Sequence, residues 1–227
     1  MTFAEIHDFV AAVERKEGGT PNRSFYLTLA NQWCRLVSRR ASLYIGDWTD
    51  ATEGGLSVDG YRVTLPTGSR GLPTEVSWNG SVLAVADVAV LDLWEPGWRS
   101  VTGDPGRWMP ETPRTILLDS APTGTGAGLL VIRGPSYLPA FSDEEGAVNP
   151  LDWVPESAQL GCAHYIISML PIEQPKIPNT SPEAMLYAQA ELTSRQQTRQ
   201  THAALYRELL GELDSVVLTS TRRQFAY

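Results

Sequence analysis

At the centre of the chain, residues 75–85 read Glu-Val-Ser-Trp-Asn-Gly-Ser-Val-Leu-Ala-Val. Asn79-Gly80 is the residue pair that most favours a two-residue type I′ turn, because both positions of that turn need a positive φ angle. The residues on either side, 75–78 and 81–85, are suited to strands. This stretch therefore predicts a β-hairpin in the middle of the chain.

Further strand patterns surround this hairpin. Residues 61–65 alternate in polarity and stop at Pro66, and residues 88–94 form an apolar run that we interpret as a strand. Residues 115–118 and 129–133 are predicted to be a strand pair, joined by the Gly- and Thr-rich turn at residues 121–128. Several short strands between frequent turns predict a small antiparallel sheet, sandwich or barrel.

Two helices are predicted before this β segment. Thr2 and Glu5 have the spacing of a capping box, and apolar residues then recur at helical spacing, which predicts a helix over residues 3–16. Asn22 is a candidate cap for a second helix that ends near residue 43. The expected apolar face of that helix consists of Phe25, Leu29, Trp33, Leu36 and Val37.

Two more helices are predicted after the β segment. Trp153-Val154-Pro155-Glu156 opens the third helix, because proline is tolerated in a first turn and an acidic residue suits its positive end. Its expected buried stripe is Leu160, Ala163, Ile167 and Leu170. Ser181 and Pro182 begin a fourth helix, which is expected to run to about residue 214.

The fourth helix has an unusual middle. Residues 193–202 include no apolar side chain, although apolar residues precede and follow them. A helix packed on a core normally keeps an apolar stripe along its whole length. Two explanations stay open: either this middle is solvated, or it meets its neighbours through hydrogen bonds.

Together these patterns predict an α+β fold with an inserted domain. Residues 1–48 and 151–215 are expected to form one helical framework, with two N-terminal and two C-terminal helices. Residues 56–140 form the inserted, small antiparallel β domain. Residues 216–227 show little helical pattern and are interpreted as a C-terminal tail that docks on a partner.

The composition excludes some classes of function. The net charge of −8 disfavours a general nucleic-acid binder, which needs a basic face, but it does not exclude an acidic wall past which nucleic acid slides. There is no apolar run of the ~20 residues that a membrane span needs, and no signal-peptide pattern at residues 1–20. We therefore expect a protein kept in the cytoplasm, or in something assembled there, with Cys34 and Cys162 as buried free thiols.

The sequence contains no clear catalytic constellation. His7, His164 and His202 lie in different predicted helices without metal-ligand spacing, and the glycines at 124, 126 and 128 lack the Lys-Ser/Thr of a phosphate-binding loop. We therefore expect neither an enzyme nor a metal or cofactor site. Trp94, Trp98 and Trp108 are either a stacking patch for a sugar or, as we favour, anchors of a core or interface.

The order of these parts resembles the head-to-tail adaptor (connector) proteins of tailed bacteriophages. The resemblance covers most of residues 1–215, although the strand region is long and no tyrosine follows Pro110. The segments that carry the resemblance are Val63-Thr64-Leu65-Pro66, Met109-Pro110 with Thr115-Ile116-Leu117-Leu118, residues 129–135, Trp153-Val154-Pro155-Glu156, Ala163-His164-Tyr165 and residues 184–190.

This resemblance implies a non-enzymatic structural protein at the head–tail junction of a virion. Such adaptors form a homo-oligomeric ring, usually a dodecamer, beneath the portal; they bind the portal protein and the tail or tail-completion protein, and DNA passes through the lumen without specific binding. Arg195, Arg199 and His202 are the candidates for a subunit or lumen face. The candidates for docking on a neighbouring ring are Arg222, Arg223, Phe225 and Tyr227.

Three other functions remain open at this point. The chain could be another phage tail component, such as a terminator or baseplate protein. It could also be a carbohydrate-binding β module carried on helices. A hydrolase is the weakest alternative, because no pair of nucleophile and base can be nominated from the residues.

Overall fold

The computed structural model describes residues 1–17, 19–51, 56–142, 147–172 and 181–224, and in the last helix it describes side chains as far as Leu213. The chain divides into two units, which we call the helical unit (Met1–Ala41 and Leu138–Tyr227) and the β unit (Ser42–Tyr137). Helices and sheets are both extensive, so the predicted α+β class is confirmed. The predicted framework boundary at residue 48 falls inside a strand of the β unit.

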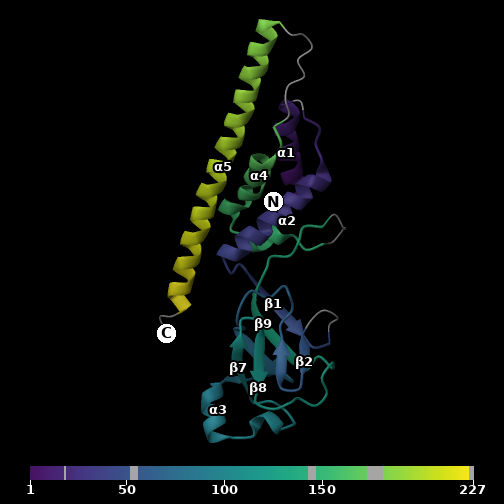
Figure 1. Ribbon diagram of the computed structural model, residues 1–227, viewed down its shortest axis with the longest axis vertical. Helices are drawn as coiled ribbons and strands as arrows, with labels where there is room; N and C mark the ends of the chain where they lie inside the picture. The colour runs from purple at the N-terminus through teal and green to yellow at the C-terminus, as the bar shows by residue number, and fades with distance from the viewer. Residues whose placement is uncertain (18, 52–55, 143–146, 173–180, 225–227) are drawn as a thin grey trace. The chain divides into compact units, whose positions relative to one another are not determined.

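Helix α4 is the centre of the helical unit. It packs against the other three long helices of this unit, and Figure 1 shows it between them. Because α4 is surrounded, residues on several of its sides are buried. The predicted buried stripe was wrong in one member, Leu160, which is 42% exposed. The helices of this unit are α1 (Phe3–Lys16), α2 (Arg23–Arg40), the short η2 (Pro150–Trp153), α4 (Glu156–Met169) and α5 (Pro182–Gln224).

Local capping fixes the starts of the first two helices as predicted. Thr2 and Glu5 form the capping box of α1, and the Asn22 side chain accepts a hydrogen bond from the Phe25 backbone N–H at 3.0 Å. α2 ends at Arg40, a few residues earlier than expected, because Ala41 is already extended and leads toward a strand. Phe25 and Leu36 of its expected apolar face are partly exposed.

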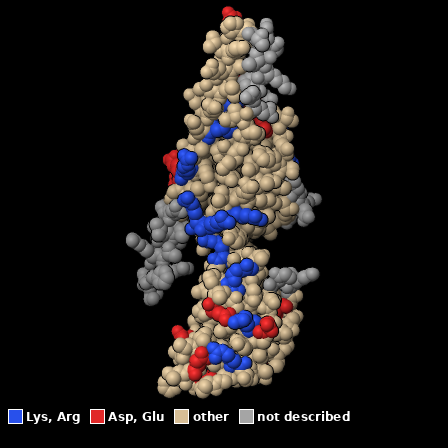
Figure 2. Space-filling model, in the orientation of Figure 1, with Lys and Arg blue, Asp and Glu red and all other residues tan. Residues whose placement is uncertain are grey.

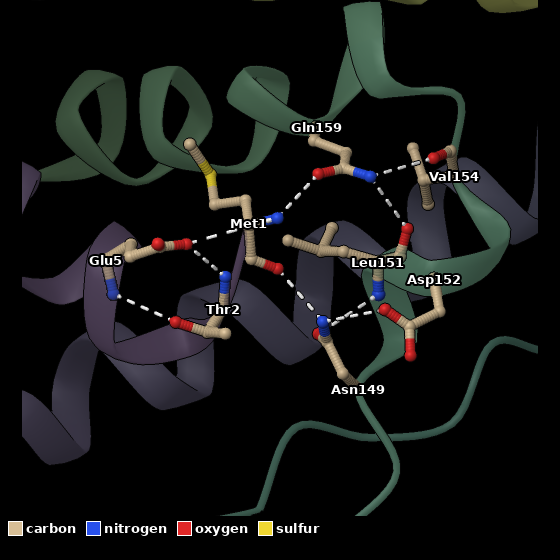
Figure 3. A network of polar contacts seen from close by, with 8 residues as sticks. All are labelled: Met1, Thr2, Glu5, Asn149, Leu151, Asp152, Val154 and Gln159. Carbon is tan, nitrogen blue, oxygen red and sulfur yellow. Dashed lines mark hydrogen bonds and ion pairs between the residues drawn. The ribbon is translucent and has the colours of Figure 1, made fainter.

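A polar network joins the start of α1 to the turn before α4 (Figure 3). The Met1 amino group donates to the Gln159 side chain at 2.9 Å, and Asn149 donates to the Met1 carbonyl oxygen at 2.9 Å. Gln159 also donates to the carbonyl oxygens of Leu151 and Val154 at 3.1 and 3.2 Å. These bonds give partners to two backbone carbonyl oxygens at the turn before α4 and connect that turn to the start of the chain.

The β unit contains two sheets. One has the strand order β1-β9-β4-β5 and the other β2-β3-β8-β7-β6. All pairings between these named strands are antiparallel except β6 with β7. The predicted hairpin is present: Asn79 and Gly80 have φ angles of 46° and 77° between β4 and β5. The strands are β1 (Tyr44–Thr49), β2 (Ser57–Asp59), β3 (Arg62–Thr64), β4 (Glu75–Trp78), β5 (Ser81–Val82), β6 (Ala84–Val85), β7 (Arg107–Thr112), β8 (Thr115–Leu118) and β9 (Leu130–Ser136).

The two sheets share one apolar core. Val76 and Ile132 from the first sheet and Ile116 from the second are fully buried in the same cluster. Side chains from both sheets thus interdigitate, which is the arrangement of a sandwich, one of the three predicted alternatives. On the first sheet Gly134 leaves room for its neighbours: a Cβ there would lie 3.1 Å from the Pro73 Cα and 3.3 Å from the Trp48 ring.

Two strand predictions were wrong. Residues 88–94 form a helix, α3 (Val88–Trp94), in which the Asp87 side chain accepts from the Ala89 N–H at 2.7 Å. β8 and β9 do not pair with each other but lie in different sheets, so the glycine-rich segment between them links sheets. A short apolar run fits a strand or a helix equally well, and pairing between distant strands cannot be read from local pattern.

Candidate functional site

One side of the polar middle of α5 packs against the rest of the helical unit. Arg195 and Arg199 are only 8% and 7% exposed. The Arg199 guanidinium donates to both carboxylate oxygens of Glu17 at 3.2 and 2.5 Å, and its Nε donates to the Leu170 carbonyl oxygen at 3.3 Å. Both explanations left open by the sequence therefore apply: the arginine side of this segment meets its neighbours through hydrogen bonds, and the opposite side is exposed.

Arg195 and Arg199, two of the candidates for a subunit or lumen face, are thus buried within a single copy of the chain, and their role in such a face stays a prediction. The Arg199 side chain reaches Glu17, which follows α1, and Leu170, which follows α4, whereas Arg195 pairs with Glu191 on α5 itself. The exposed side of the same segment is polar but uncharged. Its residues are Thr193, Ser194, Gln196, Gln197, Gln200 and Thr201.

His202, the third predicted residue of this face, is partly buried and contacts a second histidine. Its Nδ1 lies 2.7 Å from the Nδ1 of His164 on α4, so one ring donates to the other. Burial is the main cause that lowers the pKa of both imidazoles. The facing His202 lowers the pKa of His164 further. The Arg199 charge lowers the pKa of His202 further, and the Glu17 charge opposes this shift. The Phe9 ring lies edge-on to His164 with ring centroids 6.1 Å apart. The pair therefore favours uncharged rings.

A cavity of about 320 Å³ lies beside these contacts. It is lined by Val13, Lys16, Glu17, Glu191, Ser194, Arg195, Thr198 and His202. Its two basic and two acidic residues balance, so the cavity has no excess charge to select a cation or an anion. We therefore interpret the contacts around it as the attachment of α5.

The end of α5 differs from its prediction. The helix continues to Gln224 instead of ending near residue 214, so the backbone of Arg222 and Arg223 is helical and not that of an irregular tail. Phe225 and Tyr227 lie outside the described residues, and the docking role of all four residues stays a prediction.

Two exposed apolar faces are present on different units. On α3, Val90, Leu93 and Trp94 are 53%, 74% and 76% exposed, and their spacing places them on one side of the helix. We call these three residues the α3 face. The first turns of α5 carry the second, which extends around the helix because its residues are consecutive: Met185, Leu186 and Tyr187 are 52%, 67% and 79% exposed. Contiguous exposed apolar side chains of this kind mark binding surfaces in soluble proteins.

The three tryptophans considered for sugar stacking are not one patch. Trp98 and Trp108 are 2% and 5% exposed and belong to the cores of the β unit. The Trp98 indole N–H donates to Asp92 at 2.8 Å, which satisfies its polar atom inside that core. Only Trp94 of the three is exposed, so the core-or-interface interpretation fits all three positions.

Carboxylates surround the α3 face. A hollow of about 400 Å³ at its C-terminal side is lined by Glu95, Asp104 and Asp119, among others. Together with Asp87 and Asp92, these residues give the region five carboxylates. The region also contains two guanidinium groups, those of Arg99 and Arg107, so its net charge is −3. The two arginines pair with Asp92 and Glu95, respectively. The region remains acidic after this pairing.

A groove of opposite character lies on the helical unit. Its volume is about 240 Å³, and its lining is Gln32, Arg35, Leu36 and Arg39 of α2 with Tyr165 of α4. We call it the α2 groove. α2 contains four arginines and no acidic residue, and Figure 2 shows basic side chains in a band across the helical unit. The groove thus has an apolar floor between guanidinium groups.

The sequence contained the arginine cluster of α2 but not the groove, because Tyr165 is brought to it only by packing of α4. The α3 face was hidden by its assignment as a strand. The capping residue Asp87 directly before this run was the local signal that favoured a helix.

Cys34 and Cys162 are buried free thiols, as predicted, and burial raises the pKa of Cys34 to about 12. Within the described ranges, no cluster of three or more His, Cys, Asp or Glu residues is arranged to hold a metal ion. Among the described helices, none combines the length and apolar character needed to cross a membrane. The chain matches no family model and no curated protein sequence.

Proposed function

We propose that this protein is a structural subunit of a homo-oligomeric ring, the head-to-tail adaptor between the portal and the tail of a bacteriophage particle. The observation that carries the proposal is the pair of exposed apolar faces, the α3 face on one unit and Met185, Leu186 and Tyr187 on the other. A subunit inside a ring that also joins other rings needs more than one binding surface, and these surfaces must differ.

Two other features support the proposal. The order of helices and strands is that of the resemblance found in the sequence, with the β unit inserted between α2 and α4. The exposed side of the middle of α5 is polar and uncharged, and the net charge of the chain is −8. Such a surface would let DNA pass through a lumen without holding its phosphates.

Mass spectrometry of purified particles, with electron microscopy of particles labelled by an antibody against the chain, tests the proposal. We expect the protein in every particle, with label at the junction of head and tail. Label at the far end of the tail would instead indicate a terminator or baseplate protein. Absence of the chain from purified particles would refute the proposed function.

A further inference from the structure

The α3 face and the α2 groove have complementary chemistry. The first presents Trp94 and Leu93 within an acidic region of net charge −3, and the second presents Leu36 and Tyr165 between Arg35 and Arg39. Aromatic side chains and arginines are the residues that contribute most to protein interfaces. A guanidinium group also binds the face of an indole ring favourably.

We propose that the α3 face of one copy of this chain docks in the α2 groove of a second copy. In this contact Trp94 enters the groove and stacks against a guanidinium group, Leu93 covers Leu36, and the carboxylates around α3 face the arginines of α2. The proposal deepens the proposed function and rests on it, because it assigns the contact between neighbouring subunits of the ring.

The size and composition of the two surfaces favour this occupant. Trp94 is 76% exposed, so its indole ring gives up little existing packing when it is inserted elsewhere. The Tyr165 hydroxyl donates to Gln32 at 3.4 Å, which holds one wall of the groove in place before binding. A preformed groove lowers the entropic cost of association. The charge difference between the two surfaces selects this pairing over contact between two acidic faces.

The two surfaces are different, so the contact is head-to-tail. After two copies join, one copy still has a free α3 face and the other a free α2 groove, and addition continues until a ring closes. This leaves Met185, Leu186 and Tyr187 of α5 for a different partner. A contact between identical surfaces would instead stop at a dimer.

Head-to-tail contact allows a complementation experiment with two exposed substitutions. Trp94→Ala removes the inserted ring and keeps the groove, whereas Arg35→Glu reverses the charge of the groove and keeps the α3 face. Sedimentation velocity of the full chain is the measurement. We expect wild-type protein to form oligomers, each variant alone to stay monomeric, and an equimolar mixture of the two variants to form a heterodimer and nothing larger.

Matched controls separate this contact from general effects on the surface. Val82→Ala removes an apolar side chain that is 67% exposed on β5, and Arg15→Glu reverses an exposed charge on α1; both should associate like wild type. Circular dichroism verifies that all four variants are folded. The proposal is overturned if the wild type stays monomeric, if either single variant associates like wild type, or if the mixture stays monomeric.

The same variants distinguish this proposal from the proposed function. Particles produced with Trp94→Ala or Arg35→Glu should contain at least tenfold less of the chain than wild-type particles. Normal incorporation of both variants would refute the contact and leave the adaptor function standing. Absence of even the wild-type chain from particles would refute the function itself.

Discussion

Removal of the Arg199 guanidinium tests how α5 is attached. In Arg199→Ala, Glu17 loses its cation at a position where its side chain is only 14% exposed in the wild-type structure. Removing one partner of a buried ion pair costs ~3–5 kcal/mol, because the remaining charge is left without compensation. The neighbouring cavity of about 320 Å³ gives Glu17 access to water, so we place the loss at the lower end, at about 3 kcal/mol.

Urea unfolding followed by circular dichroism at 222 nm measures this loss, because the helical unit dominates that signal. Arg207→Ala, an exposed change on the same helix, is the control and should stay within about 0.5 kcal/mol of wild type. The double variant Glu17→Gln with Arg199→Met removes both charges. It should recover about 2 kcal/mol relative to the sum of its single variants, because no buried charge remains unpaired.

Two results would contradict this reasoning. A loss below about 1 kcal/mol for Arg199→Ala would mean that water replaces the guanidinium at little cost, as at an exposed pair. Additive single variants would mean that Arg199 and Glu17 do not interact in solution. Either outcome would remove the ion pair as an attachment of α5 to α1.

Three further predictions concern other packed positions. Because burial lowers the pKa of His164 and His202 in the folded state, the unfolded chain binds protons more readily, and the free energy of unfolding should fall as the pH drops below 6.5. In a pH series of urea titrations, the double variant His164→Gln with His202→Gln should flatten this slope, whereas the control His7→Gln should retain it. Equal slopes for the double variant and the wild type would contradict the role of the pair. Gly161→Ala should stabilise α4 by about 0.5–1 kcal/mol, since a Cβ there meets its nearest atoms at 3.7 Å, an ordinary contact distance; a lower midpoint of thermal unfolding would show that the helices pack more tightly. Gly134→Val should destabilise the β unit by about 1–3 kcal/mol, because even a Cβ would lie 3.1 Å from backbone, and unchanged unfolding by intrinsic tryptophan fluorescence would contradict that crowding.

The sequence predicted best where the physical cause is local. Helix α1 begins and ends at the predicted residues, because its capping box and apolar spacing lie within the helix itself. The hairpin at Asn79-Gly80 was found for the same reason, since two adjacent positive φ angles determine that turn. Local signals of this kind do not depend on the rest of the chain.

Predictions failed where the cause is distant in sequence. β8 and β9 are close in sequence but lie in different sheets: β8 pairs with β3 and with its neighbour β7, whereas β9 pairs with the distant strands β1 and β4. Only the completed sandwich core decides this. α3 was missed because its apolar run is too short for periodicity to separate helix from strand. The burial of Arg199 on α5 was not predicted because its partner, Glu17, lies 182 positions away in the sequence.

The polar middle of α5 also explains how one register of this helix is selected. Arg195 and Arg199 are four residues apart, so a slip of one helical turn, about 5.4 Å, would let Arg195 replace Arg199 at Glu17. That slip would bring Thr198 instead of His202 to His164, and the slip in the opposite direction would bring Ala203 to Glu17. An apolar stripe tolerates such slips better, because one aliphatic residue can replace another. We infer that the arginine and histidine contacts together specify the position of α5, and with it the position of Met185, Leu186 and Tyr187 at its exposed start.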